Sequence, residues 1–226
     1  MDVTSTAFWA ALGSIILANI LLSGDNAVVI ALAARALPPA QQKKAIVFGS
    51  AAAIVMRVAL TWIAAEMLKW PYLKIVGGLL LLYIGVSLML EDGGEEGADR
   101  QANASMLSAV RTILIADLVM SLDNVIAVAA AAHGNLLLLI LGLTISIPLI
   151  VFGSTLLLKV MERFPLIIVV GAGLLGYLAG EMLLTDPALP RWFAHVPEHA
   201  EAAAGVIGAA LVVAVGMLLR RRAKAA

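Results

Sequence analysis

The chain has 226 residues, of which 62% are apolar and only 13% are charged, and its mean hydropathy is +1.03. Soluble domains contain about 45–50% apolar and 25% charged residues, so the composition excludes a water-soluble globular enzyme. Fifteen basic residues balance fifteen acidic ones, which gives no support for a nucleic-acid partner. The absence of cysteine excludes disulfides and thiolate metal sites.

Long apolar segments follow one another along the chain and predict an all-α membrane bundle of seven transmembrane helices. The expected spans are residues 7–34, 44–67, 70–90, 107–132, 134–158, 165–184 and 203–219. The first span has Asp2 in place of a basic leader and a polar interior, so we expect it to remain as a helix. An acidic loop at about 91–106 is the only long polar stretch, and residues 1–226 are expected to form a single integral membrane domain.

The basic residues predict the orientation of the chain in the membrane. Three of them fall on one side of the predicted spans: Lys69, Lys74 and Arg191. Eleven fall on the other side: Arg35, Lys43, Lys44, Arg100, Arg111, Lys159, Arg163, Arg220, Arg221, Arg222 and Lys224. Because cytoplasmic loops carry the excess of Lys and Arg, we expect an inner-membrane protein with its C-terminus in the cytoplasm and its N-terminus outside.

The two halves of the chain resemble each other. The motif at residues 23–26, Ser-Gly-Asp-Asn, returns at residues 121–124 as Ser-Leu-Asp-Asn, and Trp70-Pro71 returns as Phe164-Pro165. Each copy would contain three helices, at about 7–90 and 107–184, followed by the extra helix 203–219. Because three is odd, the second copy would enter the membrane from the opposite side, which predicts two inverted three-helix repeats.

Polar residues in the first and fourth predicted helices form the candidate site. An ionised side chain near the bilayer centre costs roughly 2.5–3.5 kcal/mol on insertion scales, so such residues normally face a cavity or a partner. The candidate metal ligands are Asp25, Asn26, Asp123, Asn124, Asp117, Asn19, Ser23 and Ser121. Carboxylate, amide and hydroxyl oxygens suit hard divalent ions such as Mn²⁺, Mg²⁺ or Ca²⁺. Two other interpretations stay open: hydrogen bonds that pair the two helices, and a proton relay without metal.

Four further residues bear on this site. A helix break near Gly24 is an alternative to a continuous first helix, and it would expose carbonyl oxygens. Arg57 lies within the second predicted span and needs a carboxylate or carbonyl partner, either as a structural counter-ion or as a charge that holds the empty site together. Glu181 is a candidate for the outer vestibule. Met120 is either a soft thioether ligand or a packing residue.

The paired motifs, in a seven-span chain of this size, resemble the TerC family of integral membrane proteins in its short form without appended soluble domains. The resemblance covers nearly the whole chain. It implies a manganese exporter, with links to tellurium resistance in the family's name, whose expected ion-binding residues are Asp25, Asn26, Asp123 and Asn124. The two copies differ at Gly24 and Leu122, so the resemblance does not require both helices to break alike.

These observations predict a secondary transporter that exports a divalent cation by alternating access, with no cofactor and no enzymatic activity. The chain has no GKS or GKT motif for ATP, and its predicted spans contain no His cluster and no H-E-x-x-H. Proton entry would compensate for the outward movement of charge, with Asp117 as the spare titratable group. The alternative is a membrane scaffold or stress-response protein without transport activity. The sequence leaves homo-oligomerisation open.

Overall fold

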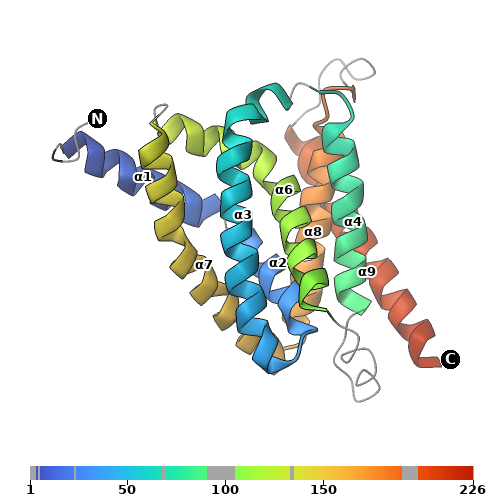
Figure 1. Ribbon diagram of the computed structural model, residues 1–226. Coiled ribbons are helices and arrows are strands. Elements are labelled where there is room, and N and C mark those ends of the chain that lie inside the picture. The colour runs from blue at the N-terminus through green and yellow to red at the C-terminus, as the bar shows by residue number, and fades with distance from the viewer. Residues whose placement is uncertain are drawn as a thin grey trace.

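The computed structural model is an all-helical bundle with the ends of the chain on opposite flanks (Figure 1). It describes residues 4, 6–22, 24–67, 70–90, 105–132, 135–189 and 198–225. Among these residues it contains α1 (Thr6–Leu22), α2 (Gly24–Arg35), α3 (Pro39–Met67), α4 (Leu73–Leu90), α6 (Met106–Ala131), α7 (Leu136–Arg163), α8 (Leu166–Leu184) and α9 (Glu198–Ala225).

The predicted first span is two helices in the structure. α1 ends at Leu22, α2 begins at Gly24, and the chain changes direction between them (Figure 1). The break near Gly24 that the sequence offered as an alternative is therefore present. The second copy of the motif lies within the continuous helix α6, where Leu122 replaces the glycine.

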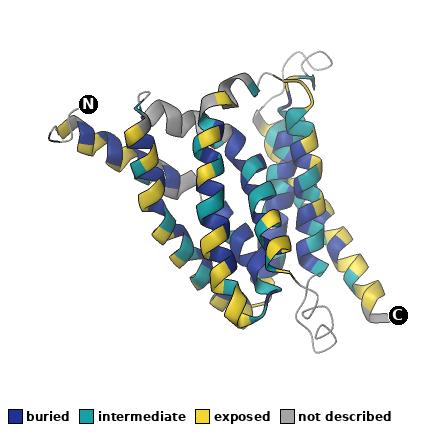
Figure 2. Ribbon diagram, in the orientation of Figure 1, coloured by how far each residue is buried: buried dark blue, intermediate teal, exposed yellow. Residues whose placement is uncertain are grey.

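Five helices in the described part of the chain are long and apolar enough to cross a membrane. Their apolar stretches are Pro39–Thr61, Leu73–Leu90, Leu137–Arg163, Leu166–Leu184 and His199–Ala223, and a shorter one covers Phe8–Leu17. Each of the five matches one predicted span. A polytopic membrane bundle is thus the architecture, and many large apolar side chains are exposed, such as Trp9, Phe152 and Val206. Figure 2 shows exposed positions along the outer helices of the bundle. Such a surface suits contact with lipid.

Two helices, α6 and α7, begin at a side chain that caps the helix N-terminus. Asn135 precedes α7, and its side-chain oxygen accepts a hydrogen bond from the Leu138 N–H at 3.3 Å. Ser105 does the same before α6, where its hydroxyl oxygen accepts from the Leu107 N–H at 3.2 Å. These side chains satisfy backbone donors that have no partner within the helix.

The N-terminus of α4 is capped from a distance by a buried carboxylate. The Asp186 oxygens accept hydrogen bonds from the backbone N–H groups of Tyr72, Lys74, Ile75 and Ala188, at 2.7–3.1 Å. Burial alone would raise the pKa of Asp186, but these four donors outweigh it, and the pKa lies below its ordinary value of 3.8. Asp186 thereby ties the end of α8 to the start of α4.

The contacts between the two halves of the chain are reciprocal. α3 packs against α6, whereas α7, which follows α6, packs against α1 and α2. α4 and α8, the last helices of the two predicted copies, pack against each other, and α9 covers α8. Backbones of α8 and α9 touch directly, because a Cβ atom added at Gly176 would overlap the Gly208 carbonyl and one at Gly180 the Ala204 carbonyl. These contacts hold α9 closely against α8.

Candidate functional site

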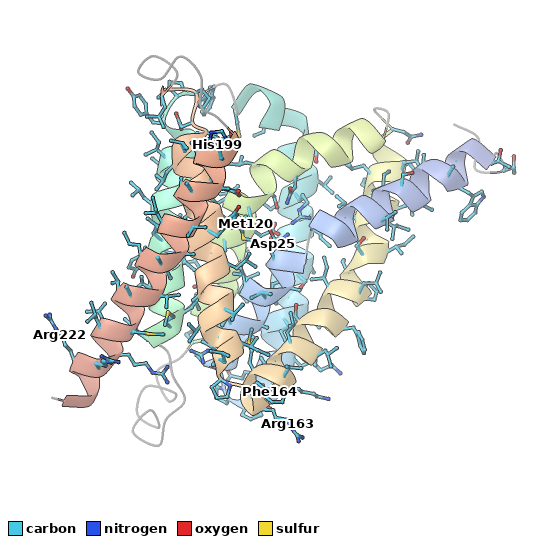
Figure 3. All side chains as sticks on the ribbon, turned by 180° about the vertical axis from the view of Figure 1, so that it is seen from behind. Asp25, Met120, Arg163, Phe164, His199 and Arg222 are labelled. Carbon is cyan, nitrogen blue, oxygen red and sulfur yellow. The ribbon has the colours of Figure 1, made fainter. Side chains whose placement is uncertain are left out.

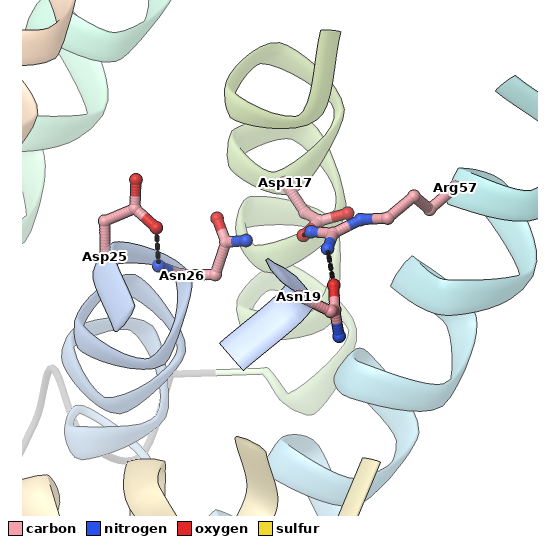
Figure 4. A network of polar contacts seen from close by, with 5 residues as sticks. All are labelled: Asn19, Asp25, Asn26, Arg57 and Asp117. Atoms are coloured by element: carbon pink, nitrogen blue, oxygen red, sulfur yellow. Dashed lines mark hydrogen bonds and ion pairs between the residues drawn. The ribbon is translucent and has the colours of Figure 1, made fainter. Parts of the chain in front are cut away.

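A buried ion pair joins three helices in the centre of the bundle. Arg57 of α3 is 2% exposed, and its Nη2 atom lies 2.5 Å from Oδ1 of Asp117 in α6. Its Nη1 atom donates a hydrogen bond to Oδ1 of Asn19 in α1 at 2.8 Å (Figure 4). The partner that Arg57 needs is therefore Asp117, the carboxyl group that sequence reasoning had assigned to proton coupling. The pair is neutral as a whole, and removal of either partner would leave the other charge buried and uncompensated.

Asp25 lies at the start of α2, directly after the helix break. Its Oδ1 atom accepts a hydrogen bond from the Asn26 backbone N–H at 2.8 Å (Figure 4). A helix N-terminus favours a negative charge, and here it supports the carboxylate. The end of α1 at Leu22 leaves the last carbonyl groups of that helix without intrahelical donors. The helix break therefore places the Asp25 carboxylate in the first turn of α2.

Several buried polar atoms near the ion pair have no hydrogen-bond partner among the described residues. They include both amide atoms of Asn26, Oδ2 of Asp117 and the hydroxyl of Ser121. The Asn26 side chain is 2% exposed and lies between Asp25 and the Arg57–Asp117 pair (Figure 4). An unsatisfied buried polar group costs about 1–3 kcal/mol, so these atoms are available to a polar or cationic ligand.

A cavity of about 270 Å³ connects the two motif copies. Asp25 of α2 and Asn124 of α6, one residue from each copy, both line it. Figure 3 shows Asp25 and Met120 close together near the middle of the bundle, between the end marked by His199 and the end marked by Arg163. The other lining residues are Lys74, Val119, Met120, Leu178, Glu181, Met182, Thr185 and Glu201.

The charges around this cavity come from four helices. Asp25, Glu181 and Glu201 contribute three carboxyl groups from α2, α8 and α9, and Lys74 of α4 contributes an ammonium group. These acids line a common space without converging, and in the part of the chain that the structure describes no three His, Cys, Asp or Glu residues are placed to hold a metal ion together. Acidic side chains therefore outnumber basic ones around the cavity, three to one.

The eight predicted ligands fall into separate groups. Asp25 and Asn124 line the cavity, and Asn19 and Asp117 bind the Arg57 guanidinium. Asn26 lies beside them, and Ser121 is fully buried in α6. Ser23 and the Asp123 side chain lie outside the described residues, although the Asp123 backbone belongs to α6.

Sequence reasoning found Glu181 and Met120 but assigned no role to Lys74 or Glu201. Lys74 enters the sequence prediction only through the orientation of the chain in the membrane, and Glu201 precedes the predicted seventh span. In the structure α9 begins at Glu198, which places Glu201 within the helix that packs on α8. The polar residues at the start of α9, before the predicted span, were the sequence feature that could have indicated Glu201.

Comparison with known proteins places the chain in a family. The profile of the integral membrane protein TerC family matches residues 4–224. An uncharacterized membrane protein of Bacillus subtilis, YjbE, is 45% identical over 176 residues, which cover 78% of this chain and 80% of the relative. The inner membrane protein YgdQ of Escherichia coli is 29% identical over 180 residues, covering 72% of this chain and 75% of that protein. No solved structure matches. The chain therefore belongs to the TerC family of integral membrane proteins.

Proposed function

We propose that this chain is a secondary transporter that exports a divalent cation, with Mn²⁺ as the expected cargo. The observation that carries the proposal is the cavity shared by Asp25 and Asn124, which come from the two copies of the repeated motif. The transported ion is the substrate, and the proposal includes neither a resident cofactor nor an enzymatic reaction.

The donor atoms around the cavity fit such a cargo. The carboxylate oxygens of Asp25 and Glu181 and the amide oxygen of Asn124 are hard ligands of the type that Mn²⁺ and Mg²⁺ prefer. Met120, which is 8% exposed, adds a thioether, a softer ligand that favours Mn²⁺ over Mg²⁺. Broken helices that present carbonyl oxygens to a cation are a recurrent feature of secondary transporters, and in this chain a helix break lies directly before Asp25.

The arrangement of the helices supports transport by alternating access. The reciprocal packing of α3 on α6 and of α7 on α1 and α2 is the pattern that two inverted three-helix repeats would give. Arg163 and Arg222 lie at the same end of the bundle, which supports a cytoplasmic position for that end and for the C-terminus (Figure 3). The seven-span topology and the external N-terminus are part of the same proposal.

Export of a dication requires an energy source. Moving two positive charges outward against an inside-negative potential costs about 4.6 kcal/mol per 100 mV. We propose proton entry as the compensation. Because Asp117 is held by Arg57, the carboxyl groups that line the cavity are better placed to carry the returning proton: Asp25, Glu181 and Glu201.

Transport by purified protein in liposomes tests the proposal. Wild-type protein should move Mn²⁺ across the membrane, and Mn²⁺ should raise its thermal stability in detergent. Asp25→Asn and Asp123→Asn preserve side-chain size but delete a charge, so both variants should fold and lose Mn²⁺ binding. Glu162→Gln, on the exposed surface of α7, is the matched control and should transport normally. Absence of both flux and Mn²⁺-dependent stabilisation in the wild type would reject the transporter and favour a scaffold.

A further inference from the structure

Arg57 bridges two residues that hold equivalent positions in the two halves of the chain. Asn19 and Asp117 hold equivalent positions, four residues before Ser23 and Ser121, respectively. In the structure both side chains direct an oxygen at the same guanidinium, at 2.8 Å from Asn19 and 2.5 Å from Asp117 (Figure 4). A pair of equivalent oxygens from two inverted copies is the natural place for a bound cation. In this protein the cation there is part of the chain.

Only the first half of the chain supplies this charge. When the copies are aligned on Pro71 and Pro165, the counterpart of Arg57 is Val151, which packs against the apolar core. α7 has no charged residue before Lys159, so a different alignment within the helix gives the same result. The duplicated helix therefore packs well without a central charge. This comparison indicates that the Arg57 guanidinium has a role other than helix packing.

The ion pair is electrostatically connected to the cavity. Asp25 is attracted by Arg57 and repelled by Asp117. Asn26, whose buried amide atoms have no partner among the described residues, lies between them (Figure 4). Asp117 also keeps its second oxygen, Oδ2, without a partner in that part of the chain. The ion pair and the cavity are thus two ends of one polar region, and a cation at Asp25 would be within the influence of both charges.

We propose that Arg57 is a tethered cation that competes with the transported ion for the oxygens of Asp117 and Asn19, an inference that rests on the proposed function. A transport site must bind its ion and also release it. When the ion leaves, the guanidinium returns to the same oxygens and neutralises them, so no buried carboxylate is left unpaired. Arg57 thereby sets the affinity for the ion, which a merely structural counter-ion would not do.

Binding of Mn²⁺ to purified protein, followed by titration calorimetry, tests this inference. Arg57→Gln removes the competitor and should tighten Mn²⁺ binding about tenfold or more, while lowering both KM and kcat for transport in liposomes. Arg57→Lys keeps the charge but loses the forked contact to both oxygens, so about threefold tighter binding is expected. Arg35→Gln is the matched control. Arg35 donates to the Leu88 carbonyl at the end of α4, and its loss should leave the Mn²⁺ affinity unchanged.

A double variant shows whether the effect passes through Asp117. Arg57→Gln combined with Asp117→Asn should lose the tightening of the single variant, because the released carboxylate is gone. Equal tightening in the double variant would overturn the proposal, as would wild-type or weaker affinity in folded Arg57→Gln. If Arg57→Gln does not fold, Arg57→Lys replaces it in the test, because that variant leaves no buried charge unpaired. Wild-type or weaker Mn²⁺ affinity in Arg57→Lys would then overturn the proposal. Failure of the wild type to bind Mn²⁺ would overturn the proposed function, and this inference with it.

Discussion

Replacement of Asp186 by asparagine should destabilise the bundle at the start of α4. The two carboxylate oxygens accept four backbone hydrogen bonds, two at each oxygen: Oδ1 from Tyr72 and Ala188, and Oδ2 from Lys74 and Ile75. Asparagine keeps one oxygen and replaces the other with an NH₂ group, which is a donor. In either orientation of the amide, two backbone N–H groups therefore lose their acceptor.

The size of the effect follows from those two groups. A buried donor left without a partner costs about 1–3 kcal/mol, so Asp186→Asn should lose about 2–6 kcal/mol. In a domain of this length even 2 kcal/mol corresponds to about 4–8 °C in Tm. Asp186 is fully buried, so water cannot easily replace the lost acceptor.

Thermal unfolding in detergent, followed by tryptophan fluorescence, measures this loss. Glu162→Gln changes an exposed carboxyl group to an amide in the same way and should leave Tm unchanged. A Tm for Asp186→Asn within about 2 °C of the wild type would refute the reasoning. It would mean that the four N–H groups find other acceptors, and that Asp186 does not hold α4 in place.

Four other predictions concern pH, helix packing, the cavity and topology. The folded-state pKa of Asp186 lies below its ordinary value of 3.8, so the Asp186 carboxylate stabilises the fold above that ordinary value. This stabilisation is lost as the pH falls through the lower folded-state pKa. The difference in Tm between the wild type and Asp186→Asn should therefore narrow below about pH 4. Gly180→Ala should cost about 1–3 kcal/mol, since its Cβ would overlap the Ala204 carbonyl, whereas Gly173→Ala meets only ordinary contacts and should be nearly neutral in the same melting assay. Glu201→Gln should raise the KM for Mn²⁺ several-fold in liposomes without changing Tm, and an unchanged KM would remove Glu201 from the ion path. A reporter fused to the C-terminus should be active in the cytoplasm and one at the N-terminus outside, and both ends on one side would exclude seven spans.

Much of the candidate site was predictable because its signals are local in sequence. Burial of a charged or amide side chain within an apolar segment costs free energy wherever the helix lies. The sequence alone therefore indicates Asp25, Asn26 and Asp117 as candidate site residues. The helix break before α2 could also be predicted from the sequence, because Gly24 weakens a helix whereas Leu122 does not. The resemblance to the TerC family rests on the same repeated motif, and the profile match over residues 4–224 confirms it.

Other features depend on contacts between distant segments. Arg57 needed a partner, but sequence alone did not show that it was Asp117, 60 residues away on another helix. Asp186 follows α8 and caps α4, more than a hundred residues earlier in the chain. No periodicity encodes such pairings, because they depend on which helix faces meet.

The sequence by itself therefore determined the membrane class, the positions of most helices and the residues whose polarity demands a partner. The tertiary structure decided which partners those residues have. It placed Asp117 with Arg57, and Asp25 with Asn124 and Glu201 around one cavity. The physical reason is that burial cost is a property of each residue, whereas its compensation depends on the packing of the whole bundle.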